Sequence, residues 1–135
     1  MAQINAAVAI ILDDNQSKVY ITQRQKHQSY SRYWEFPGGK VESDETFKQC
    51  VVREVYEEIG LLIENVRQFD TNHYINKDGI EVLVEFFIAE KMEDCGENIA
   101  TSKENQKLEL VEISALGKYK FIPGSLAVVT KLQSI

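Results

Sequence analysis

The chain begins with a near-continuous apolar run at residues 6–12. Alternate side chains of a strand point to opposite sides, so an uninterrupted apolar strand is typical of a sheet that is covered on both faces. A turn cluster follows at residues 13–16, and residues 19–22 again favour a strand, so the two strands predict a hairpin. We therefore expect the first strand to be buried on both of its faces.

A helix is indicated over residues 46–59, which contain neither glycine nor proline and place an apolar stripe along one side. Ser43 or Asp44 can cap its start, because short polar side chains accept hydrogen bonds from the free N–H groups of a first turn. Gly60 lies where a left-handed residue is favoured at the end of a helix. The sequence thus predicts both boundaries of this helix.

The rest of the chain favours strands. They are predicted at residues 34–36, 67–74, 80–89 and 108–113. A turn signal at residues 76–79 joins the second and third of these as a hairpin. Residues 92–107 are polar and aperiodic and are expected to form a mobile loop, and residues 125–132 favour a closing helix that Ser125 caps. The predicted fold class is α+β, with more strands than helices.

The composition indicates one globular domain, residues 1–135, with 44% hydrophobic and 27% charged residues. Apolar runs fall short of the roughly 20 residues that span a bilayer, and the N-terminus lacks the features of a signal peptide, so we expect a cytoplasmic protein with no membrane partner. The net charge of −6 argues against a nucleic acid polymer as partner, although it permits a small phosphorylated ligand. Cys50 and Cys95 are expected to be free thiols.

Three carboxylates crowd one face of the predicted helix. Glu54, Glu57 and Glu58 stand at i, i+3 and i+4, where like charges destabilise a helix, and they lie towards its negative end. One alternative is a solvated acidic face, partly relieved by Lys48 and Arg53. The other is a site for a hard divalent cation such as Mg²⁺, which prefers carboxylate oxygens and substrate phosphates.

A second feature precedes the helix. Gly38 and Gly39 allow the backbone to approach a ligand or metal closely, although a tight turn would explain a Gly-Gly pair equally well. Each feature is weak by itself, and the two together favour the metal site.

Residues 39–61 resemble the Nudix box, G-x5-E-x7-R-E-U-x-E-E-x-G-U with U an aliphatic residue, at all nine fixed positions. The matching residues are Gly39, Glu45, Arg53, Glu54, Val55, Glu57, Glu58, Gly60 and Leu61. Residues 6–12, 19–24 and the WEFPGGK run at 34–40 look like the MutT branch of that family, which removes oxidised guanine nucleotides. Residues 121–132 fit the same branch more loosely.

The resemblance implies a Nudix fold, an α/β/α sandwich around a mixed β-sheet with a loop-helix-loop catalytic motif. It also implies one or more Mg²⁺ or Mn²⁺ ions, bound by Glu54, Glu57, Glu58 and the backbone carbonyl of Gly38. The number of ions and the oligomeric state, monomer or homodimer, stay open.

Further roles follow from the same resemblance. Arg53 and Glu45 would hold the loop and the helix in place, and Glu54 would orient or deprotonate the attacking water. A further catalytic and metal-binding glutamate is expected from a loop after the box, where Glu104 is favoured over Glu109. Either Glu54 or Glu104 could serve as the general base.

The implied reaction converts a nucleoside triphosphate to a nucleoside monophosphate and pyrophosphate, with an oxidised purine nucleotide such as 8-oxo-dGTP as the first choice and a role in nucleotide pool sanitation and DNA repair. Arg24 would face the nucleotide, Phe36 would lie against the base, and Ser125 occupies the position where that branch has an asparagine. Because serine offers only part of an amide's hydrogen-bonding pattern, CTP or dCTP is the second choice. A catalytically silent nucleotide-sensing module is the alternative from another class.

Overall fold

The apolar run forms β1 (Gln3–Leu12), at the centre of a seven-stranded sheet in a computed structural model that describes residues 3–135. β1 pairs in parallel with β6 (Glu81–Lys91) and antiparallel with β2 (Lys18–Gln23), so the sheet is mixed and the predicted hairpin is confirmed. Its buried side chains divide between two core clusters, with Ala7, Ala9 and Ile11 in one and Ile10 and Leu12 in the other. Burial on both faces is thus confirmed.

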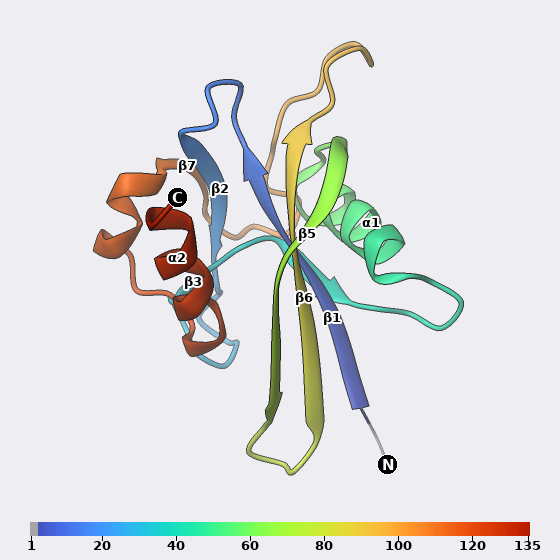
Figure 1. Ribbon diagram of the computed structural model, residues 1–135, viewed down its shortest axis with the longest axis vertical. Helices are drawn as coiled ribbons and strands as arrows, with labels where there is room; N and C mark the ends of the chain where they lie inside the picture. Colours follow the sequence, from blue (N-terminus) through green and yellow to red (C-terminus); the bar gives the residue numbers. More distant parts are fainter. Residues whose placement is uncertain (1–2) are drawn as a thin grey trace.

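The strands are ordered β3-β2-β1-β6-β5, with β7 paired to β2 and β4 paired to β1. The remaining strands are β3 (Trp34–Glu35), β4 (Gly38–Lys40), β5 (Ile63–Ile75) and β7 (Leu108–Glu112). β5 and β6 form a long antiparallel hairpin at the lower end of the view in Figure 1, beside the N-terminus. Two register shifts, between Glu64 and Arg67 and between Gln68 and Asp70, interrupt the pairing of β5.

Helices cover both faces of the sheet (Figure 1). α1 (Phe47–Ile59) packs on one face, and α2 (Leu126–Gln133) packs with the 3₁₀ helix η1 (Ile113–Lys118) on the other. The α/β/α sandwich is therefore confirmed.

The N-terminal cap of α1 differs from the prediction. Thr46 is the cap, not Ser43 or Asp44: its Oγ1 accepts from the Gln49 N–H at 3.0 Å, and the Gln49 side chain accepts from the Thr46 N–H at 2.9 Å. This reciprocal pair explains the shift, because it satisfies two free N–H groups at once. At the other end Gly60 adopts the predicted left-handed conformation, with φ of 67°.

The C-terminal helix also begins differently from the prediction. Residues 123–125 form a 3₁₀ turn, η2 (Pro123–Ser125), and the Ser125 side chain makes no capping hydrogen bond. β4 and η1 were not predicted. β4 has only three residues, two of them glycine, and η1 has only six, so neither segment is long enough to show a hydrophobic period. Residues 92–107 form neither helix nor strand, as predicted. No helix within residues 3–135 combines the length and apolar character needed to cross a bilayer.

Candidate active site

The orientation of α1 is set by its apolar stripe. Cys50, Val51, Val55 and Ile59 are buried against the sheet. The opposite edge of the helix faces β4 and the loop that follows it. The acidic residues of the helix are thereby brought to the Gly38-Gly39 backbone.

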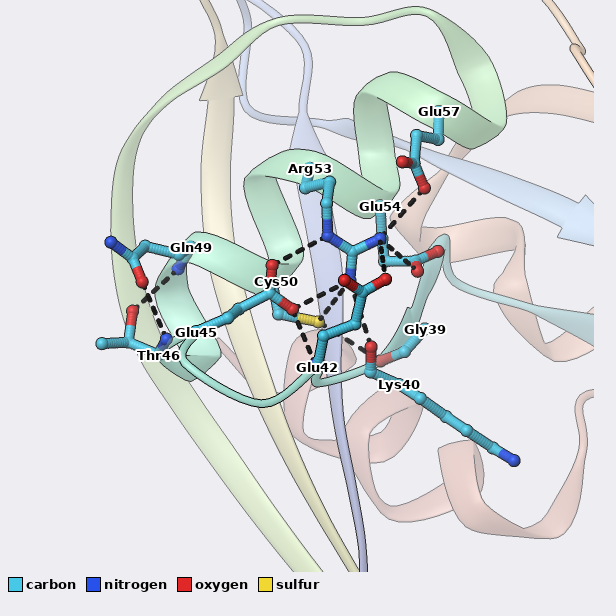
Figure 2. A network of polar contacts seen from close by, with 10 residues as sticks. All are labelled: Gly39, Lys40, Glu42, Glu45, Thr46, Gln49, Cys50, Arg53, Glu54 and Glu57. Carbon is cyan, nitrogen blue, oxygen red and sulfur yellow. Dashed lines mark hydrogen bonds and ion pairs between the residues drawn. The ribbon is translucent and has the colours of Figure 1, made fainter.

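Arg53 is the hub of a polar network at this edge (Figure 2). Its guanidinium binds both carboxylate oxygens of Glu45, each at 2.8 Å, and donates to the Lys40 carbonyl at 3.2 Å. Its Nη1 contacts Glu54 at 2.9 Å and Glu57 at 3.0 Å. Arg53 thus ties the loop to the helix, and its hydrogen bond to Glu45 lowers the pKa of that carboxyl to about 2.

The two glycines of the loop meet different neighbours. A Cβ on Gly39 would overlap the carboxylate of Glu54, with Oε1 at 2.8 Å. A Cβ on Gly38 would instead overlap the backbone of β1 at Ala7 and Val8. The Glu54 carboxylate therefore lies directly on the backbone of the loop, and a side chain at position 39 would displace it.

Glu58 is the most deeply placed carboxylate of the three. It accepts hydrogen bonds from the Gly38 N–H at 3.2 Å, from Thr22 Oγ1 at 3.4 Å and from Gln106 Nε2 at 3.4 Å. All three donors are neutral. Burial raises the pKa of Glu58 to about 7, and the nearby carboxylates of Glu35 and Glu104 act in the same direction.

The pKa of Glu54 is also raised. Burial is the largest cause, and it outweighs the opposing effect of Arg53, while the carboxylates of Glu57 and Glu104 add to the rise. Burial thus raises the pKa of two carboxylates in one small region, and among the residues that the structure describes only Glu54 of the two contacts a cationic side chain.

The loop of residues 92–107 docks on the end of α1. Lys103 N–H donates to the Glu58 carbonyl at 2.9 Å, and Thr101 N–H donates to the Ile59 carbonyl at 2.7 Å. Gln106 accepts from Ser102 Oγ at 2.7 Å and from the Glu104 N–H at 3.2 Å. The same amide therefore holds both the loop and Glu58.

Glu104 and Glu58 line one small polar cavity of about 60 Å³, together with Glu35 and Gln106. Glu109, the competing residue, lies on β7 and accepts from Tyr119 Oη at 2.9 Å. The structure thus brings Glu104, and not Glu109, to the wall of the cavity that holds Glu58.

The donor set fits a hard divalent cation. Within residues 3–135, no three acidic, histidine or cysteine side chains converge closely enough to hold a metal ion as they stand, because Glu54 and Glu57 are turned to Arg53. However, all candidate ligands are oxygens, and the buried Glu58 carboxylate has only neutral hydrogen-bond donors. A divalent cation would supply the missing positive charge.

Of the predicted substrate residues, Arg24 contacts Glu35 in the wall of this cavity, whereas Phe36 and Ser125 are buried. Arg24 Nη1 contacts Glu35 at 3.1 Å, and its Nε donates to the Ser29 carbonyl at 2.6 Å. Phe36 is only 3% exposed and stacks on Phe121 at 5.3 Å between ring centroids. Ser125 is likewise only 3% exposed. The contacts of these residues with a nucleotide stay predictions.

Sequence reasoning missed Glu35, Thr22 and Gln106 as residues of the site. Glu35 lies in the WEFPGGK run, three residues before Gly38, and this closeness in sequence could have indicated that it belongs to the site. Thr22 and Gln106 carry no such signal, because pairing of β2 with β7 brings them to Glu58.

Comparison with known proteins agrees with the geometry. The NUDIX domain family model matches residues 3–132. The 8-oxo-dGTP diphosphatase of Escherichia coli K12 is 33% identical over 135 residues, with 100% of both chains covered. The CTP pyrophosphohydrolase of the same organism is 43% identical over 61 residues, which cover 45% of this chain and 44% of that protein.

A solved structure gives the same result. A MutT structure from a study of the Aliivibrio salmonicida and Vibrio cholerae proteins matches with a TM-score of 0.77 and 30% sequence identity, covering 98% of each chain. The fold, the intact box and the full-length similarity agree. The chain therefore belongs to the NUDIX family and is a Nudix hydrolase of the MutT-like type.

Proposed function

We propose that this protein hydrolyses an oxidised purine nucleoside triphosphate, such as 8-oxo-dGTP, to the monophosphate and pyrophosphate in the presence of Mg²⁺ or Mn²⁺. The observation that carries the proposal is the meeting of Glu54 and Glu58 with the Gly38-Gly39 backbone, next to the cavity that Glu104 lines. The full-length similarity to an 8-oxo-dGTP diphosphatase supports the choice of substrate.

Glu54, Glu57, Glu58, Glu104 and the Gly38 carbonyl would hold the divalent ion. When bound, that ion supplies positive charge for the phosphate chain and for the attacking water. Glu54 then orients the water and accepts its proton as the oxygen attacks phosphorus in line. The bond from phosphorus to the bridging oxygen breaks, and pyrophosphate leaves. Glu104 is the competing base.

Arg53 does not act on the substrate in this scheme. Its contacts to Glu45 and Lys40 hold the loop, and its contact to Glu54 keeps that carboxylate beside the loop in the absence of a cation. Because the loop and the helix carry the proposed ligands, Arg53 supports the rate by holding these two elements in place.

CTP or dCTP is the second candidate. It is favoured by the similarity to a CTP pyrophosphohydrolase, which covers 45% of the chain, and by serine at position 125. A silent nucleotide-sensing role is disfavoured, because every fixed position of the box is intact.

The test is pyrophosphate release with Mg²⁺ across 8-oxo-dGTP, dGTP, CTP, dCTP and ADP-ribose. We expect the highest kcat/KM for 8-oxo-dGTP. A clear lead for CTP or dCTP would replace the oxidised purine by a pyrimidine nucleotide. Absence of turnover for every compound would contradict the proposed reaction.

A further inference from the structure

A large cavity opens beside the candidate active site. Its volume is about 870 Å³, and its walls include Arg24, Tyr30, Asn72, Tyr74, Ile75 and Gly124. The exposed fractions of Tyr30, Tyr74 and Ile75 are 53%, 43% and 68%. Exposed aromatic and apolar side chains around a concave surface suit a flat ring such as a nucleobase.

The large cavity adjoins the catalytic carboxylates through one ion pair. Arg24 lies in its wall, and the Glu35 carboxylate that Arg24 contacts at 3.1 Å lines the small polar cavity with Glu58. A nucleotide with its phosphates at Glu58 can therefore extend its base into the large cavity.

Two carboxamides line the large cavity, Asn72 and Asn76. The Asn76 oxygen already accepts from the Asp78 N–H at 2.9 Å and the Ile80 N–H at 3.0 Å, so it is committed to the hairpin turn. Asn72 donates one hydrogen to the Gly124 carbonyl at 3.2 Å, which leaves its second N–H and its oxygen for a ligand. Asn72 is thus the carboxamide free to read a base.

We propose that Asn72 determines the base specificity of this enzyme by reading the oxidised edge of the purine. The proposal rests on the proposed function. Guanine presents two adjacent acceptors, O6 and N7. Oxidation at C8 places a hydrogen on N7, so the edge becomes an acceptor next to a donor. A carboxamide matches that pair with two hydrogen bonds, whereas unoxidised guanine accepts only one.

The location of Asn72 supports this assignment. It lies on β5 and contacts Gly124, the neighbour of Ser125. Ser125 itself is 3% exposed, and a hydroxyl offers less than an amide. The amide that reads the base therefore comes from the sheet and not from the start of the last helix.

The experiment compares kcat/KM for 8-oxo-dGTP and dGTP in the wild type, Asn72→Ala, Asn72→Asp and His73→Ala. His73 is the matched control, because adjacent side chains of a strand point to opposite faces. We expect the ratio of the two kcat/KM values to fall by about ten-fold or more in both Asn72 variants, as for loss of a bidentate base contact. The His73→Ala ratio should equal that of the wild type.

The remaining outcomes contradict the proposal in distinguishable ways. Asn72 also holds Gly124, and loss of that contact alone would lower both kcat/KM values by the same factor. An unchanged ratio in the Asn72 variants therefore overturns the reading role and leaves the proposed function standing. A wild-type preference for CTP overturns the oxidised purine as ligand. No turnover by the wild type overturns the proposed function and this inference with it.

Discussion

Gly38 and Gly39 are adjacent, yet their absent side chains serve different contacts. Gly38 lets the loop approach the backbone of β1, where a Cβ would lie 2.7 Å from the Val8 Cα. Gly39 lets the Glu54 carboxylate rest on the loop. The first contact belongs to the sheet and the second to the site, so the two positions should respond differently to alanine.

We expect Gly39→Ala to lower kcat by roughly ten- to a hundred-fold, because displacement of a catalytic group by about 1 Å is this costly. The melting temperature should change little, since the displaced Glu54 side chain is flexible. Gly38→Ala should instead lower the melting temperature, because backbone cannot move aside. Gly117→Ala is the control, as a Cβ there meets nothing within 4 Å. Full activity of Gly39→Ala would contradict the placement of Glu54.

The ion pair between Glu45 and Arg53 predicts a pH dependence of stability. The pKa of Glu45 is about 2 in the folded protein, below its ordinary value of 4.5. Its contribution to the free energy of unfolding is therefore complete above about pH 4.5 and is lost as the pH falls towards 2. The melting temperature of Glu45→Gln should lie below that of the wild type at pH 7, and the difference should shrink at acid pH. A difference that is constant with pH would contradict this ion pair.

At the residue scale, spacing along one helix predicts that the box glutamates crowd one face, whereas the role of Arg53 followed from the resemblance to the Nudix box. The surroundings of Glu58 could not. Thr22 and Gln106 reach it from β2 and from the loop before β7, and the pairing of distant strands leaves no local trace in the sequence.

At the scale of elements, α1 shows how local signals can mislead by a few residues. Ser43 and Asp44 are good capping residues, but the partner that completes a capping box is Gln49, three residues after Thr46. The reciprocal bond decides the boundary. The spacing of Thr46 and Gln49 in the sequence therefore predicts the start of the helix better than a single capping residue does.

Thr46→Ala is expected to lower the free energy of unfolding by about 1 kcal/mol, because the Gln49 N–H loses its acceptor. Ser43→Ala serves as the control and should leave the free energy unchanged. Urea unfolding at neutral pH measures both variants. Equal effects of the two substitutions would contradict Thr46 as the cap.

The length of β5 was underestimated from the sequence. Residues 67–74 were predicted, but the strand extends over Ile63–Ile75, because pairing with β6 carries it past two register shifts. Long-range pairing therefore sets strand lengths that periodicity underestimates.

At the scale of the whole molecule, the sheet separates two cores, and the Arg24–Glu35 ion pair joins the walls of two separate cavities. α1 and its loop supply the carboxylates, while β5 and the 122–124 segment supply walls of the larger cavity. The apolar run at residues 6–12 predicted that both faces of the first strand are buried. The relative position of the two cavities could not be predicted, because it depends on the pairing of all the strands.

The net charge of −6 poses a problem for an enzyme of nucleoside triphosphates, because protein and substrate repel each other. The carboxylates around Glu58 make this repulsion strongest at the site itself. A bound divalent cation would offset this repulsion, so we expect hydrolysis to depend on Mg²⁺.

Metal dependence is tested by pyrophosphate release from 8-oxo-dGTP by the wild type and Glu54→Gln, each with Mg²⁺ and with EDTA. The wild type should release pyrophosphate only with Mg²⁺, and Glu54→Gln should be slower by about a hundred-fold or more, as for loss of a general base. Its melting temperature should match that of the wild type. Turnover by the wild type in EDTA, or near-normal turnover by a folded Glu54→Gln, would contradict the metal-dependent mechanism.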